Sequence, residues 1–159
     1  MYKYVVSFVL LISMSQALGN VSPADNGPYV GDISAKQLLN QYPEFKQNYH
    51  AYQPSTVEKN AVKSIQGKSL VVLFGTWCHD SEREVPRLLK LLEVAAVNLA
   101  SLSLVAVDRS KQDPAGTHSK FDLKYTPTFI LLDGDIELGR VIESPTQSLG
   151  EDLAKLLKE

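Results

Sequence analysis

The chain has 159 residues, of which 44% are hydrophobic, and its formal net charge at neutral pH is −2. This length and composition predict one compact domain with a hydrophobic core rather than a disordered chain. The 16 Lys and Arg against 18 Asp and Glu, without a basic run, argue against a nucleic-acid-binding protein, and no segment is repeated or of low complexity.

The first residues have the pattern of an export signal. Lys3 precedes an apolar run from Tyr4 to Met14, and small residues that suit cleavage follow it. The run is shorter than the roughly 20 residues of a transmembrane helix, so we expect a cleaved signal peptide. An uncleaved membrane anchor is the alternative. The mature protein is therefore expected in the periplasm or secreted, without a membrane attachment. The predicted segments are a signal peptide (1–19), a flexible lead-in (20–33) and a folded domain (34–159).

Two helical segments are expected before the first long strand. Ser34 and Gln37 have the spacing of a capping box, and so do Ser55 and Glu58. Between them, four aromatic residues recur at helical spacing: Tyr42, Phe45, Tyr49 and Tyr52. Such a stripe can form a peptide-binding platform, but we favour a helix that docks on the core.

The rest of the chain predicts a strand–helix–strand unit, a hairpin and a closing helix. The expected strands are 70–74, 102–107, 129–132 and 138–142, with an apolar helix face over 85–99, a polar connection over 109–124 and a last helix after Ser148. Asp133-Gly134 is a strong hairpin signal. We predict an α/β fold, in which helices flank a mixed central sheet built from a parallel βαβ unit and an antiparallel β-hairpin.

Cys78 is the only cysteine, and it lies where the first strand of the βαβ unit passes into its helix. The positive end of the helix dipole and the unpaired N–H groups at this point favour an anion, and a thiolate is such an anion. A lone cysteine in an exported chain is a reactive thiol, an intermolecular disulfide partner, or a buried inert residue. We expect a reactive thiol.

The residues around Cys78 resemble a known active site. Trp77-Cys78-x-x-Ser81 after an apolar strand is similar to the Trp-Cys-x-x-Cys motif of the thioredoxin-like family, with Ser81 in place of the second cysteine. Pro86 stands eight residues after Cys78, where the active-site helix of that family carries a proline. The resemblance extends from about Ser69 to the C-terminus.

A second segment carries the same resemblance. Thr126-Pro127 is similar to the cis-proline segment that lies opposite the cysteine in thioredoxin-like proteins. The resemblance implies a thioredoxin-like sandwich, a cis bond before Pro127 and thiol–disulfide exchange at Cys78. It also implies that an extended substrate segment pairs with the backbone at Thr126.

Two departures from the family pattern change the expected chemistry. Ser81 cannot resolve a mixed disulfide as a second cysteine would, although a hydroxyl at a partly exposed helix start can hydrogen-bond a thiolate. Val72 occupies the position at which many thioredoxins have a buried Asp. The expected activity is therefore monothiol exchange, in which an external thiol resolves the mixed disulfide at Cys78.

The neighbours of Cys78 have alternative interpretations. Trp77 shields the thiol or is a packed aromatic residue. His79 assists proton transfer or is an exposed residue of the first helical turn, while Asp80 interacts with the helix dipole.

Two other functions stay open. The chain can be a non-catalytic binding or chaperone-like module, or a metal-delivery protein that uses Cys78, His79, Asp80 and His118. The metal reading is the weaker one because adjacent residues rarely converge on one ion. We predict no resident metal or cofactor, and protein or low-molecular-weight thiols and disulfides as partners.

Overall fold

The computed structural model describes residues 28–158, so the predicted signal peptide lies outside the described residues. A five-stranded sheet in the order β1-β3-β2-β4-β5 forms the centre of this part of the chain. Its strands are β1 (Gly31–Asp32), β2 (Ser69–Phe74), β3 (Ser101–Ala106), β4 (Thr128–Asp133) and β5 (Ile136–Ile142). The helices are α1 (Ala35–Gln41), α2 (Pro43–Ala51), α3 (Thr56–Val62), the 3₁₀ helix η1 (Lys63–Ile65), α4 (His79–Val94), α5 (Thr117–Lys120) and α6 (Leu149–Lys155).

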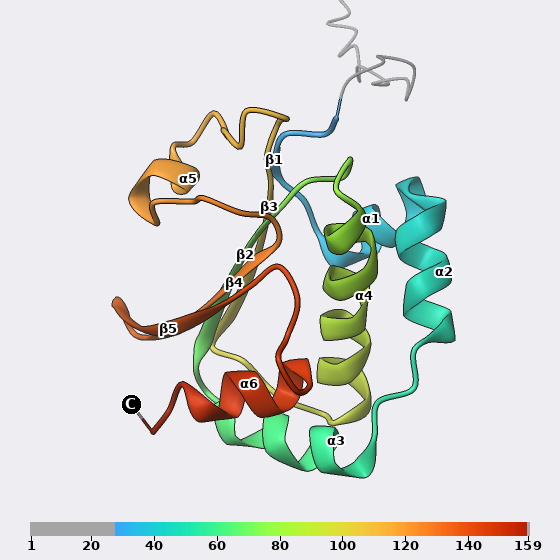
Figure 1. Ribbon diagram of the computed structural model, residues 1–159, viewed down its shortest axis with the longest axis vertical. Helices are drawn as coiled ribbons and strands as arrows, with labels where there is room; N and C mark the ends of the chain where they lie inside the picture. The colour runs from blue at the N-terminus through green and yellow to red at the C-terminus, as the bar shows by residue number, and fades with distance from the viewer. Residues whose placement is uncertain (1–27, 159) are drawn as a thin grey trace, which may run out of the picture.

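The connections make the sheet mixed. β2 and β3 are parallel and joined through α4, whereas β4 is antiparallel to both β2 and β5. Figure 1 shows α4 along one face of the sheet, with α1 and α2 beside it, and α5 on the opposite face. A βαβ unit followed by an antiparallel hairpin and a closing helix is a thioredoxin-like sandwich, which confirms the predicted fold class. Within residues 28–158, no helix is long and apolar enough to cross a membrane.

The lead-in predicted over 20–33 is wrong for its last residues. Gly31 and Asp32 pair antiparallel with Ala106 and Val105 of β3. The next residue, Ile33, is buried, and its N–H group donates to a carbonyl of β3. A two-residue strand has too little alternation to be visible in a sequence that is otherwise rich in turn formers.

The first expected helical segment is divided into two helices, and the aromatic stripe lies along the second one. α1 begins with the predicted capping box of Ser34 and Gln37, and it ends before Pro43, which opens α2. Proline disfavours helical geometry in the preceding residue, and Tyr42 accordingly has an extended backbone. The stripe still docks on the core as predicted, because Phe45 is buried and its ring centroid lies 5.9 Å from that of Phe74.

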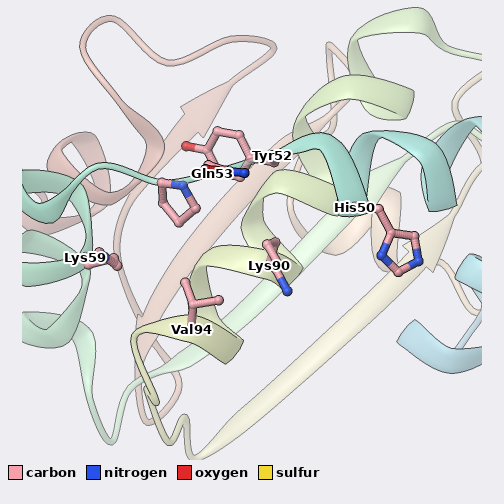
Figure 2. Close-up of a pocket in the computed structure, with 7 residues that line it drawn as sticks. His50, Tyr52, Gln53, Lys59, Lys90 and Val94 are labelled. Atoms are coloured by element: carbon pink, nitrogen blue, oxygen red, sulfur yellow. The ribbon is translucent and has the colours of Figure 1, made fainter.

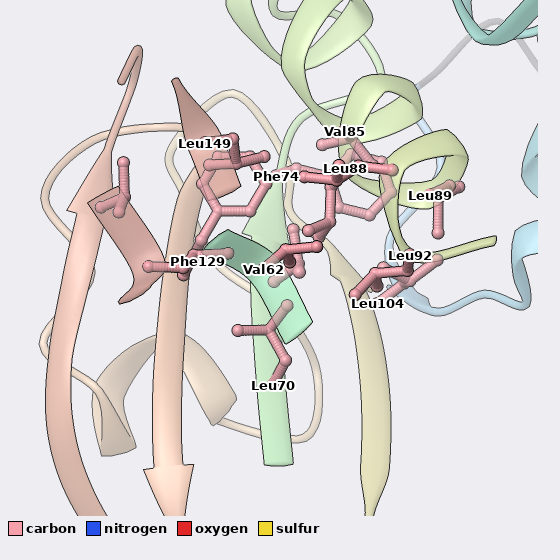
Figure 3. Close-up of a cluster of buried hydrophobic side chains, with 14 of the residues drawn as sticks. Val62, Leu70, Phe74, Val85, Leu88, Leu89, Leu92, Leu104, Phe129 and Leu149 are labelled. Carbon is pink, nitrogen blue, oxygen red and sulfur yellow. The ribbon is translucent and has the colours of Figure 1, made fainter. Parts of the chain in front are cut away.

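Both faces of β2 are covered. Leu70, Val72 and Phe74 belong to the larger hydrophobic cluster, which α4 and its neighbours complete, and Figure 3 shows several of these side chains packed together. Leu73 belongs to a smaller cluster on the other face, with partly buried Phe121 and Leu123 against it. A strand buried on both faces holds its carboxyl end in one position. The turn from Gly75 to Cys78, called the Cys78 turn below, begins there.

Candidate functional site

Cys78 is the N-cap residue of α4, and its side chain is partly buried. A tight turn joins β2 to the helix, because the N–H of Cys78 donates to the carbonyl of Gly75 at 3.0 Å. The carbonyl of Cys78 then accepts the N–H of Glu82 at 2.9 Å, which is the first hydrogen bond of the helix. The strand, turn and helix therefore place the thiol at the positive end of a helix of 16 residues.

The sulfur of Cys78 faces the segment that opens β4. Its S–H group donates to the carbonyl of Thr126, with Sγ and O 3.2 Å apart. The Thr126–Pro127 peptide bond is cis. The segment is tied to the end of β5, because the N–H of Glu143 donates to the carbonyl of Pro127 at 2.7 Å. The structure thus brings together Cys78 and Thr126, which are 48 residues apart in the sequence.

Trp77 holds the turn from outside. Its indole N–H donates to the carbonyl of Val107 at 3.0 Å, just beyond the end of β3. The ring also lies over Gly75, where a Cβ atom would come within 2.6 Å of Trp77 Cε2. The guanidinium carbon of Arg109 lies 5.4 Å from the centroid of the indole. These contacts fix the residue before Cys78 and give the ring a packed role.

Ser81 is not at the partly exposed position that we expected. Its side chain is completely buried, and its hydroxyl accepts the backbone N–H of Gly75 at 3.3 Å. The hydroxyl therefore stabilises the turn through a hydrogen bond on its buried side. Sequence spacing placed Ser81 one turn after Cys78, but it did not indicate that this face of α4 lies against the sheet.

The other two polar residues of the first helical turn have partners. The side chain of His79 is 94% exposed, and its Nδ1 lies 3.2 Å from a carboxylate oxygen of Glu82. Asp80 accepts from the guanidinium of Arg83 at 2.7 Å. The same guanidinium reaches the hydroxyl of Ser144 at 2.7 Å, so it ties the start of α4 to the segment after β5.

The residues considered for metal delivery are not gathered at one point. His118 belongs to α5, which covers the opposite face of the sheet from α4 (Figure 1). Its Nδ1 lies 2.7 Å from a carboxylate oxygen of Asp113. Residues 28–158 contain no group of three or more His, Cys, Asp or Glu side chains arranged to hold a metal ion.

Four carboxylates are buried, which the sequence pattern did not indicate. Val72 is fully buried, and the buried acids lie elsewhere, at Glu58, Glu84, Asp113 and Asp152. One carboxylate oxygen of Glu84 accepts from Arg83 at 2.6 Å and from Arg87 at 3.1 Å. The neighbouring arginines explain why Glu84 can be buried, because they supply hydrogen bonds that compensate its charge.

The other buried acids are also hydrogen-bonded. The hydroxyl of Tyr52 donates to Glu58 at 2.5 Å, and burial together with this hydrogen bond raises the pKa of Tyr52. Burial alone would raise the pKa of Asp113, but the backbone N–H groups of His118 and Thr117 outweigh it and hold the pKa at about 2. Asp152 accepts the backbone N–H of Thr146. All four acids therefore have structural partners and lie outside the Cys78 turn.

An open groove lies away from Cys78. It is formed where α2, α3 and the C-terminal half of α4 meet, and Figure 2 shows its side chains. The lining residues are His50, Tyr52, Gln53, Pro54, Lys59, Lys90 and Val94. None of them belongs to the Cys78 turn, so the groove and the thiol are separate features.

No protein-family model and no curated protein matches the chain. The solved structures that are similar to it include the following three. An HIV epitope-scaffold is 18% identical, with 79% of this chain and 76% of that chain covered and a TM-score of 0.49. A Pseudomonas aeruginosa protein of unknown function is 17% identical, with 79% and 74% covered and a TM-score of 0.48.

The third structure is the oxidised form of mitochondrial thioredoxin 3 from Saccharomyces cerevisiae. It is 20% identical, with 60% of this chain and 86% of that chain covered and a TM-score of 0.37. The fold assignment of this chain rests on its own strand order and connections.

Proposed function

We propose that the protein catalyses thiol–disulfide exchange, with Cys78 as its single reacting thiol. The observation that carries the proposal is the position of the sulfur: it lies at the N-cap of α4 and faces the carbonyl of Thr126 at 3.2 Å. A helix N-terminus favours the thiolate, which is the nucleophile in disulfide exchange.

The reaction has two balanced steps. In the first, the thiolate of Cys78 attacks one sulfur of a disulfide, the S–S bond breaks, and the other sulfur leaves as a thiolate that takes up a proton. In the second, an external thiolate attacks the mixed disulfide and releases Cys78 as a thiolate. Ser81 cannot perform the second step, because a hydroxyl does not replace a thiol as the attacking group.

The surroundings of Cys78 have distinct roles in this scheme. Ionisation of the thiol ends its hydrogen bond to Thr126, so the carbonyl is free to accept an N–H group from an extended substrate. Trp77 and Ser81 stabilise the turn, Trp77 by its hydrogen bond to Val107 and Ser81 by its hydrogen bond to Gly75. His79 is exposed beside the thiol and can exchange protons with solvent.

The location and the partners belong to the same proposal. The apolar run near the start of the sequence supports export to the periplasm or secretion, and protein or low-molecular-weight thiols are the expected partners. In an oxidising compartment, a single thiol can exchange with disulfides that form there.

The test is to follow the adduct at Cys78. The full chain is incubated with oxidised glutathione at neutral pH, and mass spectrometry measures the mixed disulfide over time. We expect wild type to form it faster than an unstructured peptide that contains one cysteine, and to lose it when reduced glutathione is added.

Two variants complete the test. Cys78→Ser should form no adduct, whereas Lys46→Gln, an exposed change on α2, should behave as wild type. If Cys78 of the folded protein reacts no faster than the peptide, exchange is not its function, and the non-catalytic binding module becomes the better explanation.

A further inference from the structure

The charged groups near the Cys78 turn are almost all paired with one another. Asp80 is paired with Arg83 at 2.7 Å, and Glu82 with His79 at 3.2 Å. Arg109, in the loop after β3, forms no ion pair with a carboxylate among residues 28–158. Within this part of the chain, its charge has no partner of opposite sign.

Arg109 is nevertheless held in place. Its guanidinium lies 5.4 Å from the centroid of the Trp77 ring, and the ring itself is fixed by the hydrogen bond from its N–H to Val107. The adjacent carboxylate of Asp108 accepts the N–H of Gln112 at 3.0 Å, so it is engaged within its own loop. Arg109 itself is exposed.

This arrangement suits the recognition of a carboxylate. A guanidinium over an aromatic ring is attracted to the face of that ring. The N–H donors along the edge of the guanidinium can then still form hydrogen bonds. Those donors match the two oxygens of a carboxylate and can bind both at once. Trp77 directly precedes Cys78 in the chain, so the ring that Arg109 lies over borders the turn that carries the thiol.

We propose that Arg109, placed over the Trp77 ring, makes Cys78 prefer disulfides that carry a carboxylate close to the reacting sulfur. The inference rests on the proposed exchange activity and specifies its substrate class. A small disulfide with carboxylates and a peptide disulfide with an acidic neighbour present the same chemistry to Arg109.

The experiment compares three small symmetrical disulfides of similar size and different charge: 3,3′-dithiodipropionate (anionic), bis(2-hydroxyethyl) disulfide (neutral) and cystamine (cationic). Mixed-disulfide formation at Cys78 gives a rate constant for each. Wild type should favour the anionic over the neutral disulfide, and Arg109→Gln should lower that ratio about two- to fivefold, as expected for one exposed charge pair. Added salt should lower the ratio in wild type, because it screens the interaction.

The matched control is Lys120→Gln, which changes the net charge equally but lies on α5. It should leave the ratio as in wild type. Alkylation by neutral iodoacetamide should proceed equally in wild type and Arg109→Gln, which would show that the thiol itself is unaltered. A second set, peptide disulfides with Glu or Gln beside the cysteine, shows whether the preferred source of the carboxylate is a peptide or a small molecule.

Two negative results are distinguishable. If Cys78 reacts readily with all three disulfides and Arg109→Gln leaves their ratio unchanged, the inference about Arg109 is wrong and the exchange activity stands. If Cys78 reacts with none of them, both proposals are wrong.

Discussion

Ser81 occupies the position that a resolving cysteine would take, and its hydroxyl accepts the N–H of Gly75 from within the core. Residues three apart on a helix lie close together, so a thiol at Ser81 can reach a mixed disulfide at Cys78. At the residue scale, this single side chain therefore separates monothiol from dithiol chemistry.

We expect Ser81→Cys to accelerate the reduction of protein disulfides when a dithiol reductant is supplied. The variant should be less stable by about 1–2 kcal/mol, because sulfur is a weak acceptor and the buried N–H of Gly75 loses its partner. Turnover and urea unfolding measure the two effects. Ser81→Ala is the control, since it loses the same hydrogen bond without gaining a thiol. Equal turnover in wild type and Ser81→Cys would show that the missing second thiol does not limit the reaction.

At the scale of elements, the loop from β3 to β4 depends on Asp113. Its buried carboxylate accepts the backbone N–H groups of Thr117 and His118, the first two residues of the short helix α5, at 3.0 and 2.7 Å. A long loop without such hydrogen bonds can adopt several conformations. The carboxylate therefore orders the connection that carries Arg109 at one end and Thr126 at the other.

We expect this carboxylate to make the stability of the protein depend on acid. The pKa of Asp113 is about 2 in the folded chain, below the ordinary 3.8. A lowered pKa stabilises the folded state above pH ~4, and the contribution, on the order of 2 kcal/mol, is lost as the pH falls from about 4 to 2. Asp113→Asn should be less stable at pH 7 and lose less stability over that range in urea unfolding. Asp122→Asn, at a largely exposed carboxylate, is the control. The same acid dependence in wild type and Asp113→Asn would contradict this assignment.

At the scale of the whole molecule, α6 closes the structure by packing against α3. Gly150 lies where the two helices approach closely, and a Cβ atom there would come 2.6 Å from the backbone carbonyl oxygen of Glu58. Backbone cannot give way as a flexible side chain does. The two helices must therefore move apart to accept any larger residue.

Gly150→Ala should consequently lower the free energy of unfolding by about 1–3 kcal/mol, the usual cost of overpacking. Urea unfolding measures the loss. The rate of iodoacetamide alkylation at Cys78 should stay as in wild type, because no hydrogen bond within the described residues joins α6 to the turn over 75–78. Unchanged stability would mean that the helices have room for a methyl group.

Much of this architecture follows from local pattern. Alternation and apolar runs predicted the long strands, capping residues such as Ser34 and Ser148 predicted helix starts, and both caps are present. The position of Cys78 between a strand and a helix followed from the same reasoning. These features depend on residues a few positions apart, so the sequence alone determines them.

The contacts that make Cys78 a candidate site depend on residues far apart in the chain. The carbonyl of Thr126 meets the sulfur, and Arg109 meets Trp77, only after the strands have paired. The burial of Ser81 and the pairing of β1 likewise depend on which face of an element meets the sheet. The sequence determined the elements because their signals are local. The tertiary structure decided what lies around the thiol, because side chains and backbone groups from separate elements come together only when those elements pack.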